Sequence, residues 1–236
     1  MRDYRLFLGE FWRTYHTTGA VLPSSAGLAR ALTQYVGEPA TSSAASNGSA
    51  QGGSAQGRHP PRRILEVGPG TGSVTRFIIR ELPAEDRLDL AELNDRFVAR
   101  LRERFEKDEP FRQVAGRAEI LHQPVEEIAD RGPYDLIISG LPLNNFSADS
   151  VERILSVLMQ LLKPGGTLSF FEYIAIRRIR AVVGGRDQRA RLRGIGRLMH
   201  DLLERHEIRR DSVWLNVPPA WVHHVQRPAD TSTSAG

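Results

Sequence analysis

The chain contains no cysteine, which excludes disulfides, thiolate metal sites and cysteine nucleophiles and fits a reducing compartment. Lysine is nearly absent as well, because only Lys107 and Lys163 occur. The formal net charge of +4 therefore depends on arginine. Arginine favours planar, bidentate contacts with phosphate or carboxylate groups, so the basic residues suit anionic partners.

Long apolar runs are also missing. No 18 apolar residues run together, so we expect no membrane-spanning segment, and the charged N-terminus lacks the apolar core of a secretory signal. The histidines show no metal-ligand spacing with carboxylates, so no metal site is expected. A chain of 236 residues can still bury a full core. These features predict a protein that is soluble or lies on a surface.

The most informative stretch is residues 62–73, Arg-Arg-Ile-Leu-Glu-Val-Gly-Pro-Gly-Thr-Gly-Ser. Its apolar run at residues 64–67 predicts a buried parallel strand, and the apolar spacing up to Leu82 predicts a helix after the glycines. Strand, glycine turn and helix together present backbone N–H groups and a positive helix end to a nucleotide-like ligand. Glycine is needed because a Cβ would block that approach.

The spacing of this turn narrows the choice of ligand. Ser73 stands where a dinucleotide fingerprint has its third glycine, and the lysine of a phosphate-binding P-loop is missing. The remaining form, Glu-x-Gly-x-Gly-x-Gly, resembles motif I of the class I S-adenosylmethionine-dependent methyltransferases. Glu92 ends the next apolar segment, where an acid can accept hydrogen bonds from both ribose hydroxyls.

Strands alternate with helices along the rest of the chain. This order predicts an α/β fold with a doubly wound, Rossmann-like, mostly parallel sheet. A turn at residues 163–166 is expected to end a long helix at residues 151–162, and a C-terminal antiparallel hairpin is expected at residues 213–216 and 221–225. The remaining strands are expected at residues 88–92, 118–122, 134–139 and 167–173.

The N-terminal part is expected to be separate. Residues 3–18 carry one apolar stripe at helical spacing, which predicts either an interfacial membrane helix or a helix that caps its own domain. A second helix is expected at residues 28–36 after the capping pair Ser24-Ser25. The predicted units are membrane-facing helices at 1–37, a flexible low-complexity loop at 38–61, a methyltransferase domain at 62–227 and a disordered tail at 228–236.

Three further segments narrow the resemblance: residues 91–94 (Ala-Glu-Leu-Asn), residues 140–146 (Gly-Leu-Pro-Leu-Asn-Asn-Phe) and residues 170–174 (Phe-Phe-Glu-Tyr-Ile). With motif I they resemble the bacterial phospholipid N-methyltransferases over about residues 1–225. The resemblance implies methylation of phosphatidylethanolamine to phosphatidylcholine through mono- and dimethyl intermediates. S-adenosylmethionine would be the cofactor and S-adenosylhomocysteine its product.

Two other functions remain open. The ribosomal RNA adenine dimethyltransferases share Glu-x-Gly-Pro-Gly, but Gly140 and Leu143 stand where they have an asparagine and a base-stacking tyrosine. The chain could also act as a membrane-binding or membrane-bending module through its first helix.

The resemblance implies a role for several groups of residues. Glu66 would orient the methionine moiety, Glu92 would hold the ribose, and Val125 with Glu126 would read the adenine although Pro124-Val125 replaces the usual Asp-Ala. The implied cofactor-binding residues are Glu66, Gly68, Gly70, Thr71, Gly72, Glu92, Leu93, Val125, Glu126, Gly140, Leu141 and Pro142.

For catalysis, the resemblance implies that Asn144 accepts a hydrogen bond from the substrate amine. Tyr173 and Tyr15 would face the cationic headgroup, although Tyr173 is equally well explained as a core aromatic.

Residues 174–193 carry an arginine series against the single acid Asp187. Such a run is often only a solvated face, and it would also suit nucleic acid. Beside an anionic leaflet each arginine contributes roughly 1 kcal/mol, and Arg177 and Arg180 are our candidates for the lipid phosphate. The expected membrane contacts are Phe7, Leu8, Phe11 and Trp12. The predicted location is therefore cytoplasmic and peripheral, on the inner face of the cytoplasmic membrane.

Overall fold

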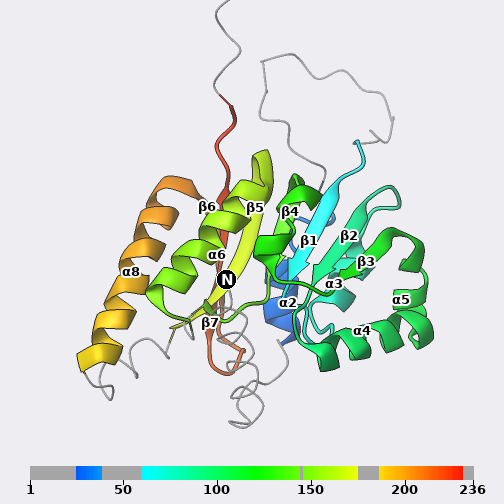
Figure 1. Cartoon of the computed structure of the whole chain (residues 1–236), viewed down its shortest axis with the longest axis horizontal. Helices are drawn as coiled ribbons and strands as arrows, with labels where there is room; N and C mark the ends of the chain where they lie inside the picture. The colour runs from blue at the N-terminus through cyan, green and yellow to red at the C-terminus, as the bar shows by residue number, and fades with distance from the viewer. Residues whose placement is uncertain (1–24, 39–59, 144–145, 175–185, 231–236) are drawn as a thin grey trace, which may run out of the picture.

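A computed structural model describes residues 25–38, 60–143, 146–174 and 186–230 (Figure 1). Within these residues seven strands form one sheet in the order β3-β2-β1-β4-β5-β7-β6. β1 to β5 run parallel, β7 is antiparallel to β5, and β6 is antiparallel to β7. The strands are β1 (Arg63–Val67), β2 (Arg87–Ala91), β3 (Ala118–Leu121), β4 (Tyr134–Ser139), β5 (Leu162–Tyr173), β6 (Glu207–Val213) and β7 (Ala220–Gln226). The predicted doubly wound α/β fold with an antiparallel C-terminal hairpin is confirmed.

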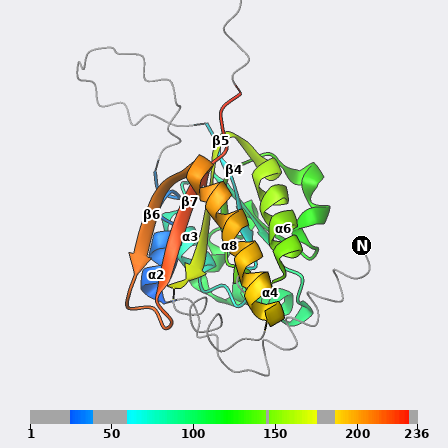
Figure 2. The same cartoon turned by 90° about the vertical axis from the view of Figure 1, so that its left-hand side faces the viewer.

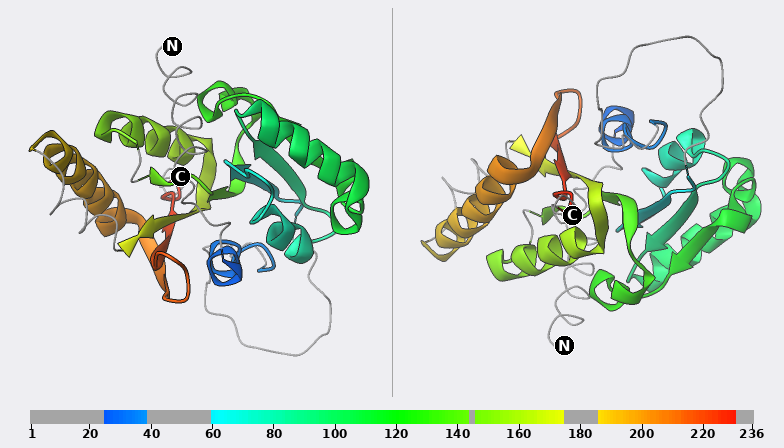
Figure 3. Two further views of the ribbon diagram at one scale, coloured as in Figure 1. Left: turned by 90° about the horizontal axis from the view of Figure 1, so that it is seen from below. Right: turned by 90° about the horizontal axis from the view of Figure 1, so that it is seen from above.

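Helices cover both faces of this sheet (Figure 3). α6 and α8 pack on one face, and α2 and α3 pack on the other. The helices are α2 (Ala26–Leu32), α3 (Thr75–Glu81), α4 (Asp95–Lys107), α5 (Glu109–Arg112), α6 (Ala148–Leu161) and α8 (Arg186–His206), with the short 3-10 turns η1 (Ala115–Arg117), η2 (Val125–Glu127) and η3 (Ala129–Arg131).

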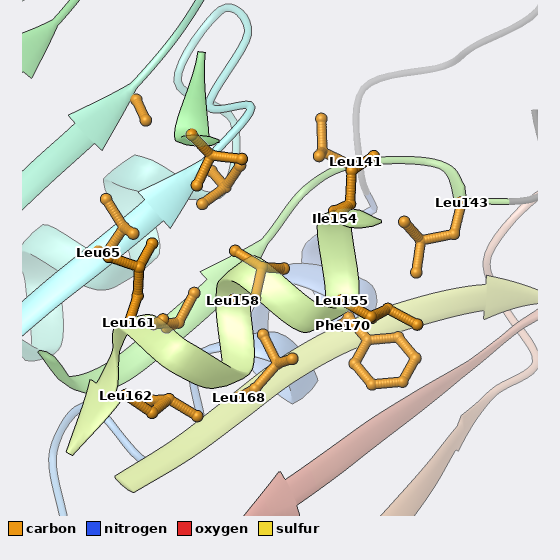
Figure 4. Packing of buried hydrophobic residues seen from close by; sticks show 14 of the residues in the cluster. Leu65, Leu141, Leu143, Ile154, Leu155, Leu158, Leu161, Leu162, Leu168 and Phe170 are labelled. Atoms are coloured by element: carbon orange, nitrogen blue, oxygen red, sulfur yellow. The ribbon is translucent and has the colours of Figure 1, made fainter. Parts of the chain in front are cut away.

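α6 shows how the sequence builds this core. Ser147 caps its first turn by accepting a hydrogen bond from the Ser150 N–H at 3.2 Å. Its apolar residues recur every three or four positions, so one stripe faces the sheet. Figure 4 shows Leu158 and Leu161 on this stripe, near Leu65 of β1. Through this contact α6 covers one face of the sheet.

The amino ends of the strands are joined by buried polar contacts. Arg62 is 4% exposed, and its Nε donates a hydrogen bond of 2.8 Å to the fully buried Asp86. Next to this pair, Arg63 and Tyr134 both donate to Asp89 Oδ2, at 2.7 and 2.8 Å. Removing one member of a buried pair would leave an uncompensated charge, so this edge is held in a fixed arrangement.

The structure corrects three sequence expectations. Residues 163–166 do not form a separate turn, because β5 already begins at Leu162. Gly165 (φ 79°) therefore lies within β5, at the point where the pairing of β5 with β4 shifts register. The first hairpin strand ends at Val213 instead of beginning there, so residues 214–219 form the connecting loop. α8 was not predicted at all.

α2 occupies most of the span predicted for the second helix, and Ser25 caps it as expected, accepting from the Leu28 N–H at 3.2 Å. Leu28, Ala29 and Leu32 are fully buried against the sheet face that contains Ile64. α2 is therefore a part of the sheet's covering layer. The division of the chain at residue 38 stays a prediction.

Removing the Leu32 side chain tests this packing. The Leu32→Ala substitution should lower the free energy of unfolding by about 2–5 kcal/mol, because it leaves a cavity in a fully buried site. Chemical denaturation measures the change. The control Arg30→Ala on the exposed face should change stability by only about 0.5 kcal/mol, and equal losses in both variants would contradict the packing.

Candidate functional site

The glycine turn after β1 lies at the carboxyl edge of the parallel strands, where open α/β sheets bind ligands. Gly68, Gly70 and Gly72 adopt φ values of 71°, 57° and 81°, a conformation that strains other residues. A Cβ on Gly68 would lie 2.7 Å from a Leu141 methyl, whereas a Cβ on Gly70 would meet nothing within 4 Å. The backbone at Gly70 therefore faces open space that a ligand can enter.

Glu92 joins this turn to the end of β2. Its Oε2 accepts a hydrogen bond from the Gly70 N–H at 3.1 Å, and its Oε1 accepts from the Leu93 and Asn94 N–H groups at 2.9 and 2.8 Å. Burial raises the pKa of Glu92, while these three N–H groups favour the ionised form and oppose the shift. The carboxylate is thus oriented at the position that the sequence assigns to ribose binding.

Glu66 is fully buried beneath the same turn, and neither carboxyl oxygen has a hydrogen-bond partner among the described residues. Burial raises the pKa of Glu66 to about 8. The neighbouring Thr75, whose hydroxyl is also buried without a partner in the described part of the chain, lowers this pKa only in part. Buried polar atoms without partners are uncommon in proteins. The arrangement suits a ligand that brings a positive charge to Glu66, as the ammonium group of a methionine moiety would.

A small pocket opens beside Glu92. Its walls are mainly apolar, and the Glu126 Oε2 atom in them is buried without a partner. Apolar walls with a carboxylate at the edge are the kind of lining that the base and ribose of an adenosine group require. The lining residues predicted from the sequence are Gly68, Glu92, Leu93, Val125, Glu126 and Leu141.

Gln123 and Pro124 also line the pocket, and their place after β3 had put them at this edge of the sheet. Two lining residues were missed, Val67 and Ala91. They are the last residues of β1 and β2, so the strand ends alone would have located them.

The loop after β4 packs directly on the glycine turn. The Gly140 N–H donates to the Val67 carbonyl at 2.8 Å, and a Cβ on Gly140 would lie 2.7 Å from the Gly68 carbonyl oxygen. Leu141 and Leu143 turn into the core, with exposed fractions of 7% and 3% (Figure 4). Pro142 between them is also buried.

Thr71, in contrast, is exposed and does not line the pocket. Tyr173 ends β5 at the same edge, but its ring lies 5.1 Å from Phe171, in the cluster under α2, and is 7% exposed. Burial raises its pKa. The structure therefore does not bring Tyr173 to the pocket wall.

The other predicted site residues lie outside the described residues, and their roles stay predictions. They are Phe7, Leu8, Phe11, Trp12, Tyr15, Asn144, Arg177 and Arg180. Within the part of the chain that the structure describes, no three histidine or acidic side chains come together as metal ligands. None of the helices described is both long and apolar enough to cross a membrane.

Comparisons with known proteins agree with this geometry. The profile of a methyltransferase-domain family matches residues 64–166. An ornithine lipid N-methyltransferase of Singulisphaera acidiphila is 28% identical over 171 residues, which cover 72% of this chain and 77% of that protein. A highly reducing polyketide synthase of Aspergillus niger is 31% identical over 124 residues, but these cover 49% of this chain and only 5% of the synthase.

Among solved structures, an O-methyltransferase from Bacillus cereus in complex with S-adenosylhomocysteine has a TM-score of 0.59 at 16% identity. The superposition covers 93% of this chain and 90% of that one, so it supports the fold. The sequence comparisons, and not this likeness of fold, support a class I S-adenosylmethionine-dependent methyltransferase, with the methyltransferase domain matched at residues 64–166. S-adenosylmethionine is its cofactor.

The proposed ribose contact can be tested with Glu92→Ala. The cofactor hydroxyls would lose a charged acceptor worth about 1.5–3 kcal/mol, so affinity for S-adenosylmethionine should fall roughly 10- to 150-fold. Calorimetry measures this, with Glu106→Ala on the exposed face of α4 as the control. Unchanged affinity for S-adenosylmethionine in a folded Glu92→Ala variant would refute the assignment of Glu92 to ribose binding.

The proposed role of Glu66 predicts proton release. Its carboxyl group stays largely protonated between the ordinary pKa of 4.5 and about 8, and an ammonium group beside it would favour ionisation. Cofactor binding in that window should therefore release up to about one proton and strengthen as the pH rises. Calorimetry in buffers of different ionisation enthalpy counts the protons. Glu66→Gln should abolish the release, and proton uptake by the wild type would refute the role.

Proposed function

We propose that this methyltransferase transfers methyl groups to an amine in a lipid headgroup. The observation that carries the proposal is the similarity to a lipid N-methyltransferase, because it spans 72% of this chain and 77% of that protein. A match restricted to the cofactor half of the fold would say nothing about the substrate. This match extends over most of both chains.

Within that class we favour phosphatidylethanolamine and its mono- and dimethyl products. The segments after β4 and at the end of β5 resemble those of phospholipid N-methyltransferases. The name of the related enzyme from Singulisphaera points instead to ornithine lipid. Both lipids present a primary amine near a membrane surface, so the chemistry required of the enzyme is the same.

When bound, S-adenosylmethionine supplies a methyl group on a positively charged sulfur, which is a good leaving group. The residues of the chain have to bind the cofactor and hold a neutral amine in line with that methyl group, about 3 Å away. In our proposal the glycine turn, Glu66 and Glu92 hold the cofactor. Asn144 cannot titrate, so it would accept a hydrogen bond from the amine and orient its lone pair.

Methylation of adenine in RNA is less well supported. Enzymes that act on an extruded base stack it on an aromatic or apolar side chain. At the corresponding position Leu143 is 3% exposed and contributes to the core beside α6, so it offers no free surface for stacking. The arginines at residues 177 and 180 would bind lipid phosphate in our proposal.

The proposal is tested with purified protein, radiolabelled S-adenosylmethionine and three acceptors: phosphatidylethanolamine in mixed micelles, ornithine lipid in the same micelles, and an adenine-containing RNA hairpin. Label should appear in phosphatidylethanolamine as a series of methylated products separated by chromatography. The Glu92→Ala variant should give far less product at the same cofactor concentration.

The three acceptors separate the possible outcomes. Label in ornithine lipid alone would support a lipid amine as the substrate, with ornithine lipid in place of phosphatidylethanolamine. Label in RNA alone, with none in either lipid, would refute the proposal. A membrane-binding module without activity would label none of the three.

A further inference from the structure

The loop between β6 and β7, residues 214–219, lies at the same edge of the sheet as the cofactor pocket. β7 is antiparallel to β5, and β6 is antiparallel to β7, so β6 runs in the direction of β5 and ends at the carboxyl edge. Val213 and Tyr173 both pair with Ala220, which fixes this position. Figure 2 shows the loop at the lower end of the sheet.

β7 is three strands away from β1 in the sheet order. At the usual strand spacing the loop therefore begins about 15 Å from the glycine turn.

The outer surface of this loop is apolar. Trp214, Leu215 and Val217 have exposed fractions of 68%, 96% and 73%. Among the described residues only Ile208 joins them as a large exposed apolar side chain. No charged residue occurs from position 212 to position 219. Apolar side chains gathered in water next to a site are unfavourable unless a partner covers them.

The loop is held in this arrangement by its one amide side chain. Asn216 is 5% exposed, its Nδ2 donates to the Pro218 carbonyl at 2.7 Å, and its Oδ1 accepts from the Ser25 N–H at 3.3 Å. The Pro219 carbonyl accepts a hydrogen bond of 2.9 Å from the Ile174 N–H. The polar groups therefore face inward, and the apolar side chains are left facing outward.

The composition around the loop fits a phospholipid surface. Tryptophan and leucine side chains partition into the headgroup region of a bilayer, and basic residues nearby are attracted to anionic lipids. Arg209 and Arg210 are exposed on β6, close behind the loop, although Asp211 pairs with Arg209. Arg210 lies over the ring of Trp221.

A second copy of the chain fits this surface less well. Three side chains bury far less than the roughly 1,000 Å² that a stable protein interface requires. The neighbouring edge strand β6 also carries Arg209, Arg210 and Asp211, and charged side chains on an edge oppose pairing with another sheet. Insertion into a bilayer needs only a few apolar side chains, because the membrane supplies the rest of the surface.

We infer that Trp214, Leu215 and Val217 insert into the headgroup region of the membrane and dock the carboxyl edge of the sheet against it. The lipid amine is thereby presented to the edge that holds the cofactor. This inference rests on the proposed function, since it gives the enzyme a way to reach a substrate that stays in the bilayer.

The test replaces Leu215 by glutamate, which its exposure should tolerate. Vesicles of phosphatidylethanolamine and phosphatidylglycerol should retain Leu215→Glu at least about tenfold less than the wild type, because a carboxylate would have to enter the headgroup region. The matched control is Ile208→Glu, which changes an exposed apolar residue at the other end of β6 and should leave vesicle binding unchanged. Affinity for S-adenosylmethionine and methylation of substrate in micelles should be retained by both variants.

The absence of cysteine allows a direct second measurement. Leu215→Cys and Ile208→Cys each create a single attachment point for an environment-sensitive fluorophore. On vesicles the label at position 215 should report an apolar environment, and the label at position 208 should continue to report water.

The outcomes distinguish this inference from the proposed function. Wild-type vesicle binding by Leu215→Glu, or a label at 215 that stays in water, overturns the inference even if lipid is methylated. If the label at 215 enters the bilayer but the protein methylates no lipid, the docking surface is supported and the proposed function is refuted. A wild-type dimer that Leu215→Glu converts to a monomer assigns the loop to a second copy, and the inference fails.

Discussion

The close approach of two glycines determines the geometry of the site. Gly68 follows β1 and Gly140 follows β4, and a side chain at either position would overlap the other segment, at 2.7 Å in each case. This contact brings the cofactor turn and the loop expected to face the substrate together at one edge of the sheet. The parallel pairing of β1 with β4 makes the contact possible, because it ends both strands at the same level. The positions of Leu141 and the pocket walls follow from it.

The sequence predicted the features whose pattern reflects burial. β4 was predicted with its observed boundaries, and β1 within one residue, because continuous apolar runs indicate strands that are covered on both faces. Glu92 was assigned to the site because it ends such a run at the carboxyl edge, whereas Glu66 was assigned through the resemblance of the glycine motif. The pairing defect at Gly165 was not predictable in the same way, because a glycine after a proline is also a common way to end a helix.

Elements with little apolar burial were predicted poorly. α8 begins within an arginine-rich stretch and contains Gly194 and Gly196, so its apolar residues at helical spacing, such as Leu198 and Leu202, did not lead to the prediction of a helix. β6 is an edge strand with mostly exposed side chains, so it lacks the alternation of a half-buried strand. At Trp214 and Leu215 the sequence instead predicted a strand where the structure has a loop. Their apolar character suggested a strand, but in the structure they face outward, so composition alone could not separate burial from exposure.

The two edges of the sheet differ in how they are held together. At the amino edge the buried Arg62–Asp86 pair and the contacts to Asp89 join β1, β2 and β4 through side chains. At the carboxyl edge the Gly70 backbone is tied to β2 by the Glu92 carboxylate, a group that is also expected to bind the cofactor. Local opening in a protein has a low free energy where buried side-chain contacts are few. The sheet can therefore fluctuate at its ligand-facing edge while the opposite edge remains closed, and exchange of cofactor for product need not involve the fold as a whole.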